Sequence, residues 1–228
     1  MTTTDHDATN VLPFQAGHSA QHDPALARIE AYWTEVRAGR LVPMRSEIDP
    51  RGLEGVLGHA FILERLTTGL ARLRLAGSHM TELLGMETRG LPLSTIFTAE
   101  ARETLADALE SVFDEPASVR FSLRSEAGFG RKELTGGMVL LPLRSDLGDI
   151  TRVLGGLSLT GPVGRTPRRL MITAQSRRSL VGYAERPGKS TGLSGRFDGD
   201  RAPQSGRAPA RRRHLQLVVA NDRPAAPV

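Results

Sequence analysis

The sequence contains no cysteine, and this absence excludes several kinds of chemistry. Without a thiol the chain has no disulfide, no thiolate metal site and no cysteine nucleophile. Lysine is also scarce, because Lys132 and Lys189 are the only two among the 30 basic residues. Runs of arginine are therefore less informative here than in a chain of mixed basic composition.

Long apolar runs are missing as well. Proline, glycine or charged residues interrupt each apolar stretch well before the roughly 20 residues that a membrane-spanning helix requires. The amino terminus is acidic and lacks the basic and apolar regions of a secretory signal. We therefore expect a cytoplasmic protein that does not enter the membrane.

Charge is distributed unevenly along the 228 residues. Residues 1–159 hold 16 basic and 21 acidic residues, a balance of −5, whereas residues 160–228 hold 14 basic and 4 acidic residues, a balance of +10. The basic character of the protein thus belongs to its carboxyl-terminal part, and the body of the chain is mildly acidic.

Composition also predicts the domain boundaries. Residues 1–23 are polar without periodicity, and residues 184–213 are rich in Gly, Pro, Ser and Arg, so neither segment can bury a core. We expect a disordered segment over 1–23, a folded domain over 24–165 with a helical extension at its start, and a basic, mostly disordered tail over 166–228.

A helix and a polar connector precede the first predicted strand. The spacing of Leu26, Ile29, Trp33 and Val36 predicts one apolar face of a helix over residues 24–38. Gly39 is suited to the left-handed cap that ends a helix.

The connector then has its own signals. Pro43 prevents the first helix from resuming. Asp49-Pro50 predicts an N-cap followed by proline at the first helical position, which begins a short helix through Leu57.

Alternating and helical patterns follow in a clear order. Strands are predicted over 61–66, 71–76, 119–124, 131–143 and 152–160. In the second of these, strict alternation predicts that Leu73 and Leu75 share one face and that the two arginines share the other.

Capping signals predict two further helices and a turn between them. Ser78 is the predicted cap of a helix over 78–84 that ends at Gly85. A short turn includes Ile96 and Phe97. A longer helix over 99–114 is predicted between Thr98 as its cap and Pro116 as its stop.

Some segments leave alternatives open. The pairs Gly136-Gly137 and Gly155-Gly156 fall inside strands and are interpreted as bulges. Residues 166–183 suit either a strand or a helix that buries Leu170, Ile172 and Leu180, and residues 215–219 suit a short strand.

The order of elements predicts an α+β fold. Two strands, three helical pieces and three strands are satisfied by a five-stranded antiparallel sheet with helices on one face. The other face needs a cover, and the first helix is the amphipathic element free to supply it.

The connector also carries a family resemblance. The pattern W-x₃-R-x-G-R-x₂-P-x-R-S-x-I-D-P over residues 33–50 resembles the start of the small bacterial PAS-domain family that occurs as stand-alone PAS proteins. The resemblance extends over roughly residues 26–160 and implies the same order of strands and helices. PAS domains sense ligands, carry cofactors or mediate protein contacts. Light-sensing types with a flavin adduct or a thioester-linked chromophore are excluded, because both need cysteine.

The resemblance implies where a ligand would bind. Apolar residues that line the PAS ligand region here are Met80, Leu83, Phe97, Leu105, Leu109, Phe113, Phe121, Leu123, Met138 and Leu140. Methionine and phenylalanine make such a lining deformable. The alternative is that these residues form a filled core without a cavity.

The resemblance also implies a role for the first helix, which in many PAS proteins packs across the sheet or across a dimer axis. We expect a homodimer with this helix at its seam. The helix residues expected to cover the sheet or to form the dimer contact are Leu26, Ile29, Tyr32, Trp33 and Val36.

Other candidate sites are weaker. The six histidines lack the spacing of a zinc helix. His79 is interpreted as a partly exposed helix residue, with a haem axial ligand as the alternative, and no haem or flavin is expected. Gly128-Phe129-Gly130 is interpreted as a hairpin turn.

The connector residues Arg45, Ser46 and Asp49 form either a polar triad or, as we favour, a structural set. In the structural interpretation Asp49 caps the short helix and Arg45 pairs with a nearby acid.

These observations favour a non-enzymatic sensory or adaptor protein in bacterial signalling that acts through protein contacts and small-ligand binding. No constellation supports an enzyme. The alternative is a nucleic-acid-associated regulator that acts through its Arg-rich tail, where Arg211, Arg212 and Arg213 would give weak, salt-sensitive binding.

Overall fold

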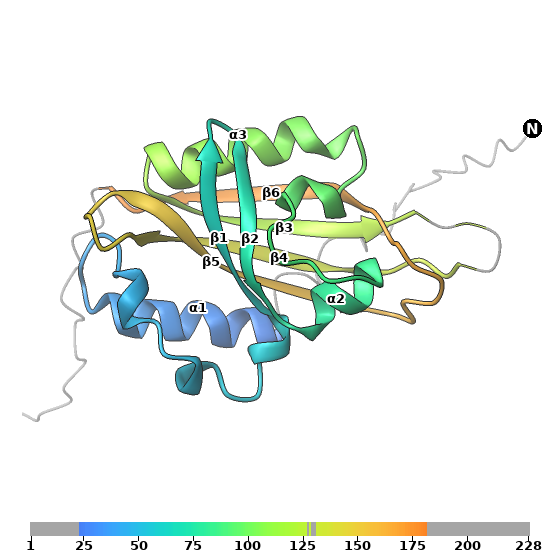
Figure 1. Ribbon diagram of the computed structural model, residues 1–228, viewed down its shortest axis with the longest axis horizontal. Coiled ribbons are helices and arrows are strands. Elements are labelled where there is room, and N and C mark those ends of the chain that lie inside the picture. The colour runs from blue at the N-terminus through green and yellow to red at the C-terminus, as the bar shows by residue number, and fades with distance from the viewer. Residues whose placement is uncertain (1–22, 127, 129–130, 182–228) are drawn as a thin grey trace, which may run out of the picture. The chain divides into compact units, whose positions relative to one another are not determined.

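Six antiparallel strands form one sheet in the order β2-β1-β5-β4-β3-β6 (Figure 1). The structure, a computed structural model, describes residues 23–126, 128 and 131–181. The strands are β1 (Ala60–Thr67), β2 (Leu70–Ala76), β3 (Ala117–Ser125), β4 (Thr135–Arg144), β5 (Ile150–Thr160) and β6 (Leu170–Ser179). The helices are α1 (Pro24–Arg37), α2 (Ser78–Leu84) and α3 (Ala101–Asp114), with 3₁₀ turns η1 (Arg45–Glu47), η2 (Pro50–Leu53), η3 (Leu57–His59) and η4 (Leu93–Ile96).

The predicted α+β fold is confirmed, with the order of elements that the resemblance implies. The helices predicted over 24–38, 78–84 and 99–114 and all five predicted strands are present, whereas the short helix predicted from Asp49-Pro50 is the 3₁₀ turn η2. The predictions for the amino-terminal segment, for residues 184–213, for residues 215–219 and for the arginine run lie outside the described residues.

The sheet lies between two apolar cores. One core joins the sheet to α2 and α3, and the other joins its opposite face to α1 and the connector. Figure 1 shows α1 and α3 on opposite sides of the strands. Strand β4 serves both cores, because Met138 and Leu140 face α3 whereas Val139 and Leu141 face α1.

Helix α1 is defined by its ends and by one buried stripe. Asp23 accepts hydrogen bonds from the backbone of Ala25 and Leu26, at 2.9 and 3.1 Å, and so caps the first turn. The left-handed residue at the carboxyl end is Ala38, one position before the predicted Gly39, which is also left-handed. The indole Nε1 of Trp33 donates to the carbonyl of Pro142 at 2.9 Å in a fully buried contact.

The connector is tied to α1. Asp49 caps η2 as predicted, since its carboxylate accepts from Arg51 N at 3.0 Å, although this turn ends at Leu53 instead of reaching Leu57. The Tyr32 hydroxyl donates to the Asp49 carbonyl at 3.0 Å and accepts from the Asp49 amide at 2.8 Å. Gly52 leaves room for the Tyr32 ring, because a Cβ at position 52 would overlap that ring.

Alternation in β2 does not hold to its end, so the predicted shared face of Leu73 and Leu75 is wrong. Leu63 pairs with Leu73 but Ile62 pairs with Leu75, which leaves one extra residue on β2. Such a bulge turns the residues beyond it to the other face of the sheet. Leu73 is therefore fully buried, whereas Leu75 is 51% exposed on the α1 side.

The predicted glycine bulges in β4 and β5 are also wrong, because pairing runs without interruption through both glycine pairs. In β5 the glycines admit close packing instead. A Cβ at Gly155 would overlap the Phe61 ring, and a Cβ at Gly156 would lie 2.8 Å from Ile29 Cδ1.

Helix starts differ from the predicted caps. The N-cap of α2 is Gly77 and that of α3 is Glu100, so Ser78 and Thr98 do not occupy the cap positions. Gly85 is left-handed at the end of α2, as predicted. These differences of one or two residues leave the packing of both helices unchanged.

A sixth strand extends the sheet beyond the five expected. For residues 166–183 the structure selects a strand, β6, which pairs along the whole of β3. Leu170 and Leu180 are buried and Ile172 packs against the larger core. Because most β6 side chains are exposed and polar, backbone pairing with β3, not an apolar pattern, holds this strand in place.

Arg168 is a buried cation between these parts. It donates to the carbonyls of Val163 and Lys132 at 2.6 and 2.7 Å, to the carbonyl of Glu126 at 3.2 Å and to the Ser125 hydroxyl. These bonds join the β3–β4 connection to the segment leading into β6. Residues beyond the expected domain end at 165 therefore contribute to the buried structure.

Replacing Trp33 tests the attachment of α1. We expect Trp33→Ala to lower the free energy of unfolding by about 3–5 kcal/mol, because it opens a cavity and removes the bond to Pro142. Trp33→Phe keeps a ring but removes the buried hydrogen bond to that carbonyl, which costs about 1–3 kcal/mol. Urea denaturation followed by circular dichroism measures both changes. Leu147→Ala, at a residue 91% exposed, is the control, and equal effects of all three substitutions would refute the interpretation.

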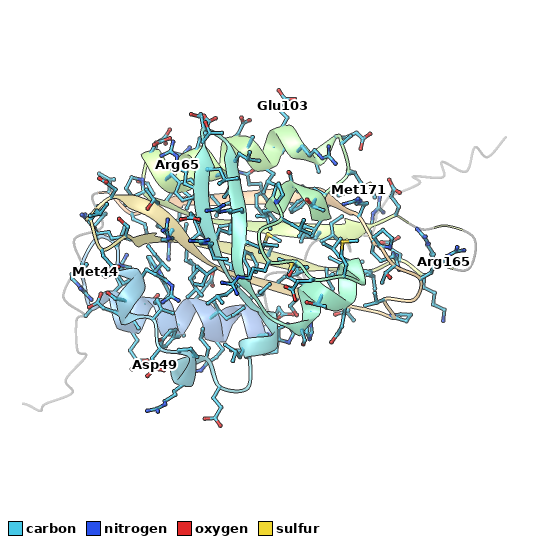
Figure 2. The ribbon with its side chains drawn as sticks, in the orientation of Figure 1. Met44, Asp49, Arg65, Glu103, Arg165 and Met171 are labelled. Carbon is cyan, nitrogen blue, oxygen red and sulfur yellow. The ribbon has the colours of Figure 1, made fainter. Side chains whose placement is uncertain are left out.

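Replacing Arg168 tests the contribution of the segment before β6. We expect Arg168→Met to destabilise the full chain by about 2–4 kcal/mol, because several buried carbonyls lose a charged donor. Arg165→Met removes the same charge from an exposed side chain nearby (Figure 2) and is expected to have little effect. Thermal and urea denaturation of both variants compare them, and similar stabilities would show that the Arg168 bonds add nothing.

Candidate functional site

The ten predicted ligand-lining residues come together in the core between the sheet and helices α2 and α3. Each is no more than 4% exposed, and they derive from α2, α3, β3, β4 and the residue after η4. The members are Met80, Leu83, Phe97, Leu105, Leu109, Phe113, Phe121, Leu123, Met138 and Leu140. They are hereafter called the helix-side core. Ligand binding in this core stays a prediction.

The predicted residues of α1 lie against the other face of the sheet. Leu26, Ile29, Tyr32 and Trp33 are buried there and Val36 packs beside them. Their contacts are made within this chain, mainly with β4 and β5. The expected homodimer stays a prediction.

The three polar connector residues do not form a triad with one another. Asp49 caps η2 and Ser46 is exposed. The predicted pairing of Arg45 with a nearby acid is wrong, because Glu47 binds Arg40 at 2.9 Å and the Met44 amide at 2.8 Å instead. The Arg45 guanidinium has no hydrogen bond or ion pair with a described residue.

A cavity of about 420 Å³ lies where the connector faces β1 and β2. Its lining is predominantly apolar and includes Arg45 from the connector. The residues that line it are Arg45, Ile48, Pro50, Leu53, Leu57, Gly58, Ala60, Phe61, Ile62, Leu75, Ala76, Gly77, Ser78 and Leu154. We call it the connector cavity. Sequence reasoning missed it, because the β2 bulge that brings Leu75 to this side has no signal in the pattern.

An ion cluster occupies the same face of β1, β2 and β5. The Glu64 carboxylate lies 2.6 Å from Arg72, 3.0 Å from Arg74 and 2.8 Å from Arg152. Burial acts to raise the pKa of Glu64, but the hydrogen bond from Arg72 and the three guanidinium charges outweigh it and lower that pKa. Three cations around one carboxylate leave this surface positive.

Two histidines meet beside the connector cavity. The rings of His59 and His79 have centroids 3.8 Å apart, and Nδ1 of His59 lies 3.0 Å from the Leu157 carbonyl. Burial lowers the pKa of His79, and the charge of His59 lowers it further, against the opposing effect of Glu82 and Asp23. The sequence could not reveal this contact, because the two residues come from separate elements.

Other kinds of site find no support in the described part of the chain. No group of three or more acidic or histidine side chains among the described residues could hold a metal ion. None of the helices in this part is long and apolar enough to cross a membrane. Gly128 and Arg131 exchange backbone hydrogen bonds, as in a tight hairpin.

The chain matches a known protein family. A family model described as a PAS domain matches residues 21–158, which is more than half of the chain. The matched range includes helices α1, α2 and α3, the connector, strands β1 to β4 and nearly all of β5. No curated protein matches the chain.

The histidine pair predicts a pH dependence. A folded-state pKa of His79 below its ordinary value of 6.5 means that the unfolded chain binds this proton more readily. The contribution to the free energy of unfolding is therefore complete above about pH 6.5 and is lost as the pH falls toward the lower folded-state pKa. We expect His79→Gln to flatten the profile of stability as the pH falls below about 6.5. His59→Gln should move the pKa of His79 part of the way toward 6.5, because burial remains, and NMR titration measures this change. An unchanged titration in that variant would contradict the contribution of His59.

Proposed function

Because the chain belongs to the PAS-domain family, we propose that it is a sensory signalling protein without catalytic activity. In this proposal the helix-side core binds a small apolar ligand, and the signal is passed on through contacts with a partner. The partner is either a different protein or a second copy of this chain. PAS domains are generally sensory, which supports the broader role. The finer proposal is supported by the way the sheet connects its two cores.

The observation that carries the proposal is the alternation of β4. Met138 and Leu140 belong to the helix-side core, whereas the intervening Val139 and the next residue, Leu141, pack toward α1. A well-packed strand transmits displacement because its two faces cannot move independently. A ligand that shifts Met138 or Leu140 would therefore shift the surface on which α1 rests.

Helix α1 is suited to report such a shift. The Trp33 indole donates a hydrogen bond to the carbonyl of Pro142, the residue that follows Leu141 in β4. The outward side of the helix presents polar residues, including Arg28, Thr34 and Glu35. Its apolar side is used within the chain, so a partner on the outward side would make a polar and reversible contact.

The alternative function through the Arg-rich tail rests on residues outside those the structure describes. No observation on the described residues favours it.

Trp33, the single tryptophan, permits a direct test. The full chain is titrated with three small apolar probes, namely indole, toluene and cyclohexane. Melting temperature and native mass are recorded for each probe. Tryptophan emission is recorded for toluene and cyclohexane only, because indole itself fluoresces. We expect at least one probe to raise the melting temperature and to change the Trp33 emission. At 100 times its dissociation constant a ligand adds about 2.7 kcal/mol to stability.

Two variants locate the effect. Leu109→Phe adds volume to the helix-side core and is expected to abolish binding, whereas Leu147→Phe changes an exposed residue and is expected to preserve it. Binding without any change in Trp33 would overturn the transmission step. Failure of every probe would overturn the ligand step, and a native mass that never departs from the monomer would remove the second copy as partner.

A further inference from the structure

The connector cavity has features that the sensory proposal does not use. We propose that it binds a small amphipathic anion, with an apolar chain inside the cavity and a carboxylate or similar oxyanion at Arg45. The site lies on the sheet face opposite the helix-side core. It goes beyond the proposed function, and either can fail without the other.

Size and lining suit an apolar chain. The volume of about 420 Å³ falls in the range of pockets that hold small molecules. Ile62 and Leu154 come from the sheet, whereas Leu53 and Leu57 come from the connector. Leu57 and Leu75 are each about half exposed, so covering them with an apolar chain would remove further apolar surface from water.

Arg45 supplies the charge. It is half-buried at the lining, and its guanidinium is unpartnered among the described residues because the neighbouring acids are engaged elsewhere. Glu47 is held by Arg40 and the Met44 amide, and Asp49 caps η2. A guanidinium beside apolar surface binds oxyanions well, since its planar fork forms paired charge-assisted hydrogen bonds.

The surrounding charge favours the same class of ligand. Arg74, which is adjacent to Leu75, belongs to the cluster of three arginines around Glu64. Glu64 lies two residues beyond Ile62 on the same face, whereas the next residue, Arg65, lies beside α3 (Figure 2). The net positive charge of this cluster raises the local concentration of anions over that of neutral molecules of similar shape.

The test uses decanoate as the probe with the full-length protein. Its matched controls are 1-decanol, which has the chain without the charge, and acetate, which has the charge without the chain. Isothermal titration calorimetry is expected to show saturable binding of decanoate at one site, at least tenfold weaker binding of 1-decanol and no measurable binding of acetate. Equal binding of decanoate and 1-decanol would overturn the role of the charge.

Paired charge variants place the anion. Arg45→Gln is expected to weaken decanoate binding about tenfold, which corresponds to the loss of one charge-assisted contact. Arg51→Gln removes the same charge from an exposed residue of the same connector that does not line the cavity, and it should bind as the unaltered protein does. Equal loss in the two variants would reduce the effect to general charge and overturn the site.

A second pair of variants places the chain. Leu75→Gln changes a half-exposed lining residue and is expected to weaken decanoate binding severalfold. Leu147→Gln changes an exposed residue outside the cavity and is expected to leave decanoate binding unchanged. Melting temperatures confirm that both variants fold. Loss of decanoate binding in Leu109→Phe but not in Leu75→Gln would assign the ligand to the helix-side core instead. A native mass showing that two copies associate and exclude decanoate would make a second copy the occupant, and would overturn the proposal.

Discussion

The need to cover both faces of β4 and β5 governs the rest of this structure. Their residues alternate between two apolar cores, so neither face of the central sheet can be left to water. Helices α2 and α3 cover one face. Helix α1 covers the other, and it comes close because Gly156 has no side chain to meet Ile29. The buried bond from Trp33 to Pro142 then aligns the helix with the strand it covers.

The placement of α1 determines where the connector runs, and the connector determines where the connector cavity lies. Tyr32 holds the backbone of Asp49 from both sides, and Gly52 admits the Tyr32 ring. These constraints bring Arg45 to the lining of the cavity beside β1 and β2. Arg45, from the polar pattern over residues 33–50, thus lines a cavity distinct from the helix-side core, and our two ligand proposals concern separate faces of the sheet.

Much of the fold and part of the candidate site could be predicted from the sequence, because they depend on local patterns. Periodicity defined α1 and α3 to within two residues, and Asp49-Pro50 identified the start of η2. The ten residues of the helix-side core were named because the family resemblance implied that they line one region, and the structure brings them together in one core. The face of Leu75 and the partner of Arg45 were predicted wrongly, because a bulge and a competing ion pair are decided by neighbours distant in the sequence or by geometry within the connector.

Sequence alone was sufficient for the α+β class, the order of helices and strands, and the need for a cover over the second face, since apolar periodicity and capping chemistry act over a few residues. Contacts between distant segments decided the remainder. Strand β6 follows from the backbone groups that β3 leaves unpaired, and Arg168 is buried because carbonyls from the β3–β4 connection and from the segment before β6 converge on it. The connector cavity and the contact between His59 and His79 likewise exist only once separate elements pack together, so their residues carry no local pattern that predicts them.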